Sequence, residues 1–437
     1  MKLVSTRNAD LAVSFGNAVL DCIPLDGGLY VPAKEEDLRP WIMYMDESTS
    51  FASIAGTLTA ALLKDEFSPV VTERIAATAY TGLSPELRQL DDNVWSLELY
   101  HGPTGCHKDF ALLWFASALS HICTIQDRSA TVLAATGGMT GRSMATAFAG
   151  KPRLKTILVY PKGAATGLDP ASLASNGGNI WPVEIEGTLQ DAQRLVRDIY
   201  GDRRLVEERG LTLANTMNIG RLLPHVFSYM YAFTRLRKRV GGDIFYAVPS
   251  GNYGNLVAGL YSWKFSLPVN GFLTDATATL SCDTSGKCEC RDSSIPLLSR
   301  GPADPASPSN LERLEQVFAV NPMMLRGFVF PVEVADSSVP ELTRQAYKKY
   351  GVFLDPHAAR AYGAVVAAGN RVYADEGTVV LVSKDHPAFE ADTIAGYTGV
   401  RPEVPAPFRG FNESVRALTR IGAERGALEA LVKEITG

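Results

Sequence analysis

The chain has 437 residues, of which 46% are hydrophobic and 20% are charged, a composition typical of a folded protein with two or three domains. Its net charge of −5 comes from 42 basic and 47 acidic residues without a block of like charge, so no nucleic-acid partner is expected. The N-terminal segment lacks an apolar signal-peptide core, and no run of about 18 apolar residues occurs, which predicts no membrane partner and a cytoplasmic location.

Taken in chain order, the first 93 residues show an extended start, a turn at 25–32 and then helical patterns, and we expect them to form an N-terminal subdomain. From residue 94, apolar strand-like runs alternate with helical patterns, which predicts β-α-β units and an α/β fold with parallel sheets. Strands are expected at 94–100, 130–135, 155–161, 179–187, 243–249 and 378–385. Helices are expected at 110–122, from 140 onward, and at 189–200, 221–239 and 255–265.

A segment from about 276 to 310 is rich in Ser, Thr, Asp and Pro and is interpreted as a long loop. Three of the six cysteines, Cys282, Cys288 and Cys290, lie within it. Because their spacing lacks a second Cys-x-x-Cys pair or a nearby histidine, no metal site is predicted. Six cysteines in a chain of this length also predict no disulfide framework.

Three glycine-containing segments each follow a predicted strand, at 101–110, 135–143 and 248–255. Loops at the C-terminal ends of parallel strands line the ligand crevice of an open α/β sheet. We therefore expect these three segments to converge on one site.

The segment at 248–255, VPSGNYGN, joins a predicted strand to a helix that begins near Asn255. Small residues there would let backbone N–H groups approach an anion, and the helix N-terminus would add a favourable dipole, so a phosphate cradle is one interpretation. An ordinary strand-to-helix turn capped by asparagine is the other. No Gly-Lys-Ser/Thr follows, so the segment is not a P-loop.

The segment at 135–143, ATGGMTGRS, lacks the G-x-G-x-x-G spacing of a dinucleotide loop. The hydroxyl of Thr140 and the N–H groups from Gly138 to Gly141 would suit a carboxylate at a helix start. On its own this segment would favour an NAD-dependent dehydrogenase, which leaves the other two glycine segments unexplained.

Lys108 lies beside His107 in GPTGCHKDF, at the start of an apolar helical pattern. A lysine among apolar and glycine-rich neighbours can have a lowered amine pKa, as Schiff-base chemistry with a carbonyl cofactor requires. A lone lysine is usually a solvated charge, but its occurrence together with a phosphate-like cradle favours the chemical interpretation.

Eight segments resemble, in the same order, those of the pyridoxal-phosphate-dependent threonine synthases, whose fold also includes the tryptophan synthase β chain. They are STR at 5–7, LDGGLYVP at 25–32, LELYHGPTGCHKDF at 97–110, YPKG at 160–163, NTMNIGRLLPH at 215–225, VPSGNYGN at 248–255, PSNLER at 308–313 and DHPAF at 385–389. The resemblance implies two open, mostly parallel-sheet domains after the N-terminal subdomain of 1–93. The smaller, 94–225, would carry the Schiff-base lysine and the larger, 226–437, the cofactor phosphate loop.

The resemblance also implies a lyase that converts O-phosphohomoserine to threonine and phosphate by γ-elimination and β-addition of water, acting as a monomer or homodimer. Lys108 would be the catalytic residue and would form the Schiff base, while Ser383 would lie near the pyridine nitrogen. The residues implied to hold the cofactor phosphate are Ser250, Gly251, Asn252, Tyr253, Gly254 and Asn255. The residues implied to bind substrate are Thr136, Gly138, Thr140, Asn218 and Arg221.

The sequence departs from this family where substrate should bind. Gly137 and Met139 replace a serine and an aspartate of the family pattern, and the loop at 274–304 also differs. His107 stands where an aromatic residue precedes the lysine, and Lys384 stands near an expected threonine. Three functions therefore stay open: a threonine synthase, a related phospho-lyase or γ-replacement enzyme acting on phosphohomoserine or a similar amino acid, and a binding protein that kept the fold.

Overall fold

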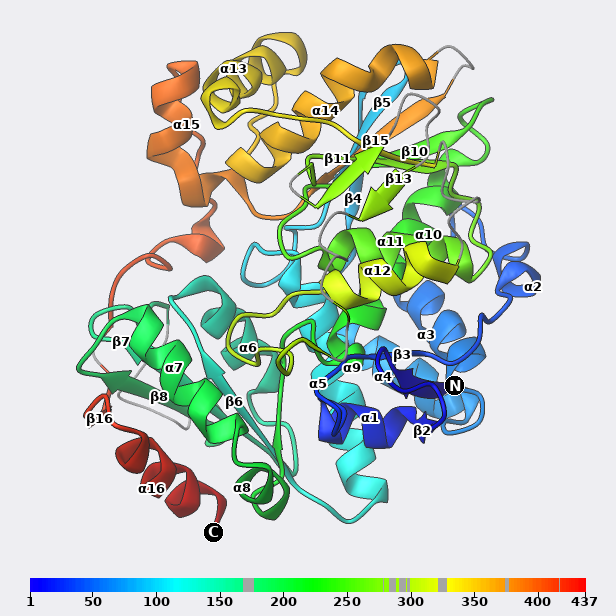
Figure 1. Ribbon diagram of the computed structural model, residues 1–437. Coiled ribbons are helices and arrows are strands. Elements are labelled where there is room, and N and C mark those ends of the chain that lie inside the picture. The colour runs from blue at the N-terminus through cyan, green and yellow to red at the C-terminus, as the bar shows by residue number, and fades with distance from the viewer. Residues whose placement is uncertain are drawn as a thin grey trace.

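The computed structural model describes residues 1–167, 177–277, 279–282, 288–290, 296, 299–320, 328–373, 377–415 and 417–437. Two mostly parallel sheets lie in different parts of the molecule, with an N-terminal region beside them (Figure 1). The predicted α/β fold class is confirmed. In the part of the chain that the structure describes, no helix combines the length and the hydropathy that crossing a membrane requires.

The N-terminal region combines a small antiparallel sheet with helices. Its strands, in the order β2-β1-β3, are β1 (Lys2–Ser5), β2 (Val13–Ser14) and β3 (Tyr30–Pro32). Its helices are α1 (Phe15–Asp21), α2 (Arg39–Ile42), α3 (Phe51–Leu62) and α4 (Pro69–Tyr80). The hydroxyls of Ser14 and Ser50 accept backbone N–H bonds at the starts of α1 and α3, where helical donors otherwise lack partners.

The larger sheet has six strands in the order β14-β11-β10-β15-β5-β4, and only β5 and β4 are antiparallel neighbours. The strands are β4 (Glu86–Asp91), β5 (Val94–Glu98), β10 (Ile244–Ala247), β11 (Gly271–Thr274), β14 (Val329–Pro331) and β15 (Thr378–Ser383). The surrounding helices are α10 (Val226–Leu236), α11 (Gly254–Lys264), α12 (Leu311–Val320), α13 (Val339–Tyr350), α14 (Pro356–Tyr373) and α15 (Ala391–Thr398). Because side chains alternate along a strand, Tyr246 and Val380 join the core that contains α10 and α11, whereas Ala247 and Leu381 join the core that contains α13 and α14.

The smaller sheet has five parallel strands in the order β16-β8-β7-β6-β9. The strands are β6 (Ala130–Ala135), β7 (Leu154–Pro161), β8 (Ile180–Ile185), β9 (Leu211–Thr212) and β16 (Thr419–Ile421). The helices beside it are α5 (Lys108–Ile125), α6 (Met139–Phe148), α7 (Leu189–Tyr200), α8 (Arg203–Glu208) and α16 (Arg425–Thr436). A capping box between Thr188 and Asp191 starts α7, which explains why that predicted helix begins where the polar pair occurs.

The sheets do not follow the three contiguous segments inferred from the sequence. Strands β4 and β5 belong to the six-stranded sheet, although α5, which follows them, packs beside α6 of the smaller sheet. At the other end of the chain, β16 and α16 return to the five-stranded sheet, where β16 pairs with β8. Each sheet-bearing part is thus assembled from separated stretches of the chain, so single cut points at 93 and 225 do not describe it.

Two further sequence expectations are corrected. The predicted helix at 221–239 is divided into α9 (Ile219–Leu222), η1 (Leu223–His225) and α10, because Pro224 lacks an N–H group and interrupts α-helical bonding. The predicted loop contains a hairpin of β12 (Leu280–Cys282) and β13 (Cys288–Cys290). The side chains of Cys282, Cys288 and Cys290 lie outside the described residues. Other short helices are η4 (Asp336–Ser338), η5 (Pro387–Glu390) and η6 (Ala406–Phe408).

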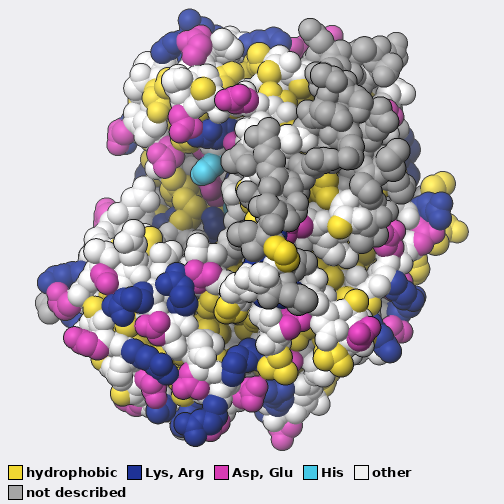
Figure 2. All heavy atoms as spheres, viewed as in Figure 1, with side chains coloured by type: hydrophobic (Ala, Val, Ile, Leu, Met, Phe, Trp, Pro, Cys, Tyr) yellow, Lys and Arg dark blue, Asp and Glu magenta, His cyan; other side chains and the backbone are white. Residues whose placement is uncertain are grey.

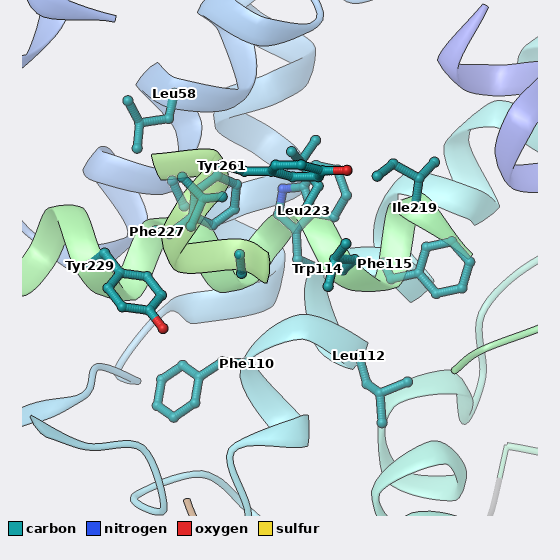
Figure 3. Close-up of a cluster of buried hydrophobic side chains, with 14 of the residues drawn as sticks. Leu58, Phe110, Leu112, Trp114, Phe115, Ile219, Leu223, Phe227, Tyr229 and Tyr261 are labelled. Atoms are coloured by element: carbon teal, nitrogen blue, oxygen red, sulfur yellow. The ribbon is translucent and has the colours of Figure 1, made fainter. Parts of the chain in front are cut away.

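Helix α5 runs through the interior of the molecule, with buried residues on nearly every side. Its Trp114 ring makes edge-to-face contacts with Phe15 from the N-terminal region and Phe227 from α10, at centroid distances of 6.1 and 6.0 Å. Figure 3 shows side chains of α5 among residues from α3, α9, α10 and α11. Because a helix this apolar must be enclosed on all sides, its first residue, Lys108, is held in a fixed place.

Arg313 of α12 connects the N-terminal region to the loop after β9. The side chain is 0% exposed, and its guanidinium donates hydrogen bonds to the carbonyls of Tyr30, Thr216 and Met217 at 2.9, 2.6 and 2.7 Å, and to Asn310 Oδ1 at 2.7 Å. Burial lowers the pKa of Arg313 to about 10, so the group stays charged near neutral pH. One buried cation thus satisfies four acceptors from three separate segments of the chain.

We predict that Arg313→Met destabilises the protein by at least about 3 kcal/mol, because buried acceptors left without donors each cost roughly 1–3 kcal/mol. The change should appear in urea denaturation followed by circular dichroism. Arg204→Met is the matched control, since the Arg204 side chain is 84% exposed on α8, and a surface change of this kind should stay within about 0.5 kcal/mol. Equal stability of the two variants would contradict this account of Arg313.

Candidate active site

The loops after β5, β6, β10 and β15 border a cavity of about 290 Å³. The molecular surface is hollowed between the two sheet-bearing parts (Figure 2). Lys108, Thr140, Gly251 and Asp385 each come from a different one of these loops or from the helix start that follows it, and all four line the cavity. The expected convergence of the three glycine-containing segments is confirmed, and it occurs at strand C-termini, as in other open α/β sheets.

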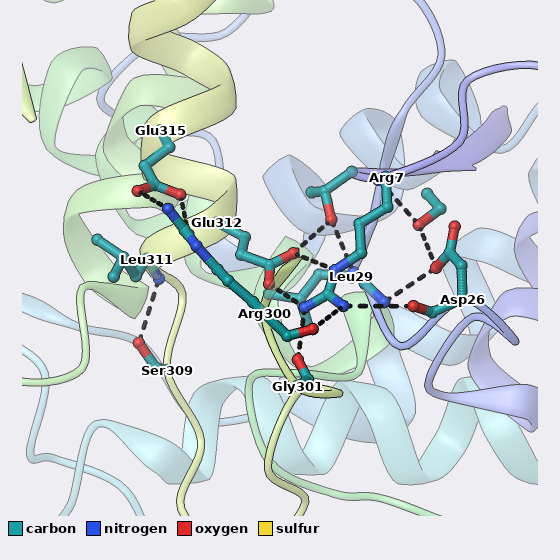
Figure 4. A network of polar contacts seen from close by, with 12 residues as sticks. Arg7, Asp26, Leu29, Arg300, Gly301, Ser309, Leu311, Glu312 and Glu315 are labelled. Atoms are coloured by element: carbon teal, nitrogen blue, oxygen red, sulfur yellow. Dashed lines mark hydrogen bonds and ion pairs between the residues drawn. The ribbon is translucent and has the colours of Figure 1, made fainter. Parts of the chain in front are cut away.

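A larger cavity, of about 680 Å³, lies between the N-terminal region and α7. Arg7 and Arg300 line it, but both guanidiniums are engaged by the carboxylates of Glu312 and Glu315 on α12 (Figure 4). Among the described residues, its lining contains no lysine, cysteine or histidine. Nucleophilic and proton-transferring groups gather in the smaller cavity, which is therefore the candidate active site.

The loop before Lys108 is closed around a buried carboxylate. Asp109 is 1% exposed and accepts hydrogen bonds from the backbone N–H and the hydroxyl of Thr104 at 2.7 and 2.6 Å. A Cβ on Gly102 would lie 2.5 Å from Asp109 Oδ2, so this position requires glycine. The Thr104 hydroxyl also lies 2.7 Å from Ser143 Oγ of α6, which ties the loop to the smaller sheet.

Lys108 Nζ lies 3.3 Å from Cys106 Sγ and 4.0 Å from Asp385 Oδ1. The Cys106 thiol donates to the same carboxylate oxygen at 2.8 Å, and burial raises the pKa of this thiol to about 12. Burial alone would lower the pKa of Lys108, but its sulfur and carboxylate neighbours hold that pKa above the ordinary value. Since the thiol is neutral at pH 7, Asp385 supplies the charge that stabilises the ammonium. In turn, Lys108 keeps the pKa of Asp385 well below its usual range despite burial.

Two neutral histidines flank this ion pair. His107 Nδ1 lies 3.4 Å from Asp385 Oδ1, and burial lowers the pKa of His107 to about 3. Its ring lies 5.7 Å from that of His225, whose pKa burial holds well below the ordinary value. His225 Nε2 lies 2.6 Å from an Arg221 nitrogen. Arg221 Nε has no hydrogen-bond partner among the described residues, so this buried cation is available to an anionic ligand.

The loop from Ser250 to Asn255 presents free backbone donors beside the start of α11. Gly251 has a φ of +47° and Tyr253 a φ of 63°, and these left-handed conformations turn the chain so that α11 begins at Gly254. The N–H groups of Gly251, Asn252 and Asn255 have no acceptor among the described residues. Free N–H groups at a helix N-terminus suit an anion, so the phosphate-cradle interpretation is favoured over a simple capped turn.

The sequence-predicted residues divide between those that line the cavity and those that do not. The residues that line it are Lys108, Thr140, Arg221, Ser250, Gly251, Asn252, Gly254 and Asn255. The residues outside the lining are Thr136, Gly138, Asn218, Tyr253 and Ser383.

Three of the predicted residues outside the lining form hydrogen bonds that hold the loops around the cavity. Thr136 Oγ1 accepts the N–H groups of Gly138 and Gly141 at 3.3 and 2.9 Å, which folds the loop before α6. Asn218 is 0% exposed and donates to backbone carbonyls at 2.9 and 3.0 Å. The Tyr253 hydroxyl contacts Thr279 Oγ1. These contacts place the side chains in the framework that supports the cavity.

Ser383 does not face the cavity. Its hydroxyl lies 3.3 Å from Ser96 Oγ, on the neighbouring strand β5, and the side chain is 3% exposed. Side chains alternate along a strand, so the next residue, Lys384, lines the cavity instead. The departures Gly137 and Met139 also lie outside the lining.

Several polar residues of the cavity were not assigned to the site from the sequence, among them Thr216, His225, His357 and Asp385. Asp385 is the last residue of the strand predicted at 378–385, which was a usable indication because strand C-termini carry the site. His357 follows Asp355, a carboxyl whose pKa burial raises to about 6. The sequence around His357 contains no motif that relates it to the other loops. Its place in the cavity therefore follows from the tertiary fold alone.

Comparison with known proteins agrees with this geometry. Residues 71–385 match the family model of pyridoxal-phosphate-dependent enzymes, and residues 2–80 match that of the threonine synthase N terminus. The chain is 31% identical over 374 residues to threonine synthase of Escherichia coli (strain K12), a match that covers 84% of each chain. It is 29% identical over 416 residues to threonine synthase of Haemophilus influenzae, covering 94% of this chain and 95% of that one. The crystal structure of threonine synthase from Escherichia coli superposes with a TM-score of 0.79 at 27% identity, over 99% of this chain and 100% of that chain.

These matches first define the class: the chain is a pyridoxal-phosphate-dependent enzyme. Within that class it belongs to the threonine synthase family. The family, enzyme class and cofactor inferred from the sequence motifs are confirmed, and the dehydrogenase and binding-protein alternatives are set aside.

The residues of the cavity fit the cofactor. Pyridoxal phosphate offers an aldehyde, which a lysine amine can attack, and a phosphate, which free N–H groups at a helix start can bind. Lys108 supplies the amine, and the loop that begins at Ser250 supplies the donors. A Cβ on Gly254 would lie 3.1 Å from Asn252 Oδ1 and 3.3 Å from Thr216 Cγ2, so the small residue keeps the loop compact where the phosphate would bind.

We predict that Asp385→Asn lowers the pKa of the Lys108 amine, because a carboxylate within about 4–6 Å stabilises the ammonium by 1–3 pKa units. More of the amine is then unprotonated near pH 7, so the cofactor-free variant should combine with pyridoxal phosphate about tenfold faster. Stopped-flow measurement of the visible Schiff-base absorbance across pH should show the rate profile displaced to lower pH. Asp392→Asn is the control, since the Asp392 side chain is 87% exposed, and an undisplaced profile in Asp385→Asn would refute the coupling.

Proposed function

We propose that this enzyme converts O-phosphohomoserine and water into threonine and inorganic phosphate. The family relationship supports this reaction, since a threonine synthase is 31% identical over 84% of the chain. The observation that carries the proposal is a single cavity that contains Lys108, Arg221 and the donor loop at Gly251. An amine, a free cation and an anion cradle are the groups that a phosphorylated amino acid and a phosphorylated cofactor require.

When bound, pyridoxal phosphate supplies an electron sink that stabilises negative charge on the carbon skeleton of the substrate. Lys108 would have two roles: its amine would hold the cofactor, and its Nζ would carry the protons that leave and return to the substrate carbons. Asp385 stabilises the ammonium form between these transfers, because it lies 4.0 Å from Nζ. Neutral His107 and Cys106 surround the pair without adding a charge.

The substrate carries a carboxylate and a phosphate, and two groups in the cavity suit anions. Thr140 lies in the first turn of α6, where its hydroxyl and the N–H groups of Met139 and Thr140 would hold the carboxylate. The N–H groups of Gly138 and Gly141 already donate to Thr136 Oγ1. The buried guanidinium of Arg221 would bind a second anionic group. Thr136, Gly138 and Asn218 would support these contacts by holding the loops in place.

The loop from Ser250 to Asn255 would hold the cofactor phosphate, with Tyr253 shaping the turn rather than contacting the ligand. A cytoplasmic location and a monomeric or homodimeric state belong to the same proposal. The buried free thiols of Cys22, Cys106 and Cys123 are compatible with a reducing compartment.

We predict that Lys108→Ala abolishes the visible Schiff-base absorbance and lowers turnover of O-phosphohomoserine by at least about 10³-fold, because both the attachment and the proton carrier are lost. Phosphate release and amino-acid product should be measured together on the same sample. Lys162→Ala is the control, since the Lys162 side chain is 62% exposed and pairs with Glu186.

Each product pattern has a defined meaning. Threonine and phosphate in equal amounts support the proposed reaction. Phosphate with 2-oxobutyrate, or with a replaced γ-group, would assign the protein to the phospho-lyase or γ-replacement alternative. Turnover that persists in Lys108→Ala would remove Lys108 from the mechanism.

A further inference from the structure

Lys384 is a buried cation at the end of β15 that no residue in the described part of the chain neutralises directly. The side chain is 9% exposed, and it lines the active-site cavity. No described residue accepts a hydrogen bond from its Nζ, and none of the ion pairs of the described residues includes it. The ammonium group is thus largely withdrawn from bulk water and borders the cavity without a direct anionic partner, an environment that favours an anionic ligand.

The carboxylates around Lys384 are engaged elsewhere. Asp275 accepts the backbone N–H of Ser250 at 2.6 Å. Asp355 accepts the N–H groups of His357 and Ala358 at 2.8 and 3.2 Å. Asp385 accepts the Cys106 thiol and pairs with Lys108. These acids influence Lys384 through space, but none forms a direct contact with its ammonium group.

The ammonium group of Lys384 lies beside the loop that would bind phosphate. A Cβ built on Gly251 would lie 3.4 Å from Lys384 Nζ, so the ammonium group lies against the loop at a residue that has no side chain. The N–H groups of Gly251, Asn252 and Asn255 are free in the described part of the chain. Free backbone donors and a buried ammonium thus lie at one place, beside the N-terminus of α11, an eleven-residue helix.

We propose that Lys384 is a ligand of a phosphate group bound at the Gly251 loop. A phosphate dianion carries more charge than backbone N–H groups and a helix dipole can neutralise, and an ammonium group completes that neutralisation. The phosphate has two chemical sources in this enzyme, the cofactor and the substrate. The inference rests on the proposed function, which places both the cofactor phosphate and the substrate phosphate in this cavity. It assigns a binding role to Lys384 at the end of β15, in place of Ser383, whose hydroxyl faces Ser96.

Lys384→Met is the principal test, because methionine keeps a similar length without the charge. The full-length chain, freed of cofactor, is titrated with pyridoxal phosphate, with pyridoxal, which lacks the phosphate, and with inorganic phosphate. If Lys384 binds the cofactor phosphate, affinity for pyridoxal phosphate should fall about 10–100-fold, as expected for losing one charged hydrogen bond. Affinity for pyridoxal should change less than about twofold, inorganic phosphate should bind more weakly, and Lys384→Arg should restore part of the loss.

If Lys384 binds the substrate phosphate instead, both cofactor affinities stay unchanged. KM for O-phosphohomoserine then rises about tenfold or more while kcat changes little. Equal weakening of pyridoxal phosphate and pyridoxal would overturn the proposal, since the contact would be with the ring. Unchanged cofactor affinities together with an unchanged KM would overturn it as well.

Lys151→Met is the matched control. Lys151 is a half-buried lysine that donates to Ser117 Oγ at 2.9 Å and lies outside the active-site cavity. Circular dichroism checks that each variant is folded, and Lys384→Gln replaces Lys384→Met if the latter does not fold. The cofactor titrations do not depend on which amino acid the enzyme makes, so failure of this inference is distinguishable from failure of the proposed reaction.

Discussion

The burial of α5 is the constraint on which the active site depends. This helix is apolar on nearly every side, so it is stable only when the N-terminal region, the α9–α10 segment and the smaller sheet all enclose it. Its first residue is Lys108, and the residue after it is the buried Asp109 that closes the preceding loop. The position of the Lys108 backbone is therefore set by the largest hydrophobic core of the molecule, while Cys106 and Asp385 hold its amine.

Charge balance is the second constraint, because the cavity brings three cations, Lys108, Arg221 and Lys384, into a region withdrawn from water. Only Lys108 has a carboxylate within ion-pair distance among the described residues. Burial keeps His107 and His225 neutral, so they do not add to the positive charge. An enclosure with excess positive charge favours anionic ligands, which agrees with a phosphorylated cofactor and a substrate that carries two acidic groups.

Much of this could be predicted from the sequence, and the exceptions have physical causes. Strands such as 130–135 and helices such as 189–200 were predictable because hydrophobic periodicity and capping are local properties. Lys108 and the loop at 250–255 were predictable because small residues and a lysine beside strand ends indicate particular chemistry. The orientation at 383–384 was not, because the face that each side chain takes depends on the pairing of β15 with β5 and β10. The return of 419–436 to the smaller sheet likewise depends on tertiary packing, which no local pattern encodes.

Lys384 and Asp385 carry charges that must be considered together. They are adjacent residues of opposite charge at the end of β15, so together they add no net charge to the cavity, yet they serve different neighbours. Asp385 faces Lys108 and Cys106, whereas Lys384 faces Gly251. Removal of Asp385 alone would leave Lys108 without its ion-pair partner, and removal of Lys384 alone would leave the donor loop without its neighbouring cation. Residues that share an electrostatic environment in this way should not behave additively. Two residues joined by one peptide bond, Asp385 and Lys384, therefore lie beside Lys108 and beside the Gly251 loop, respectively.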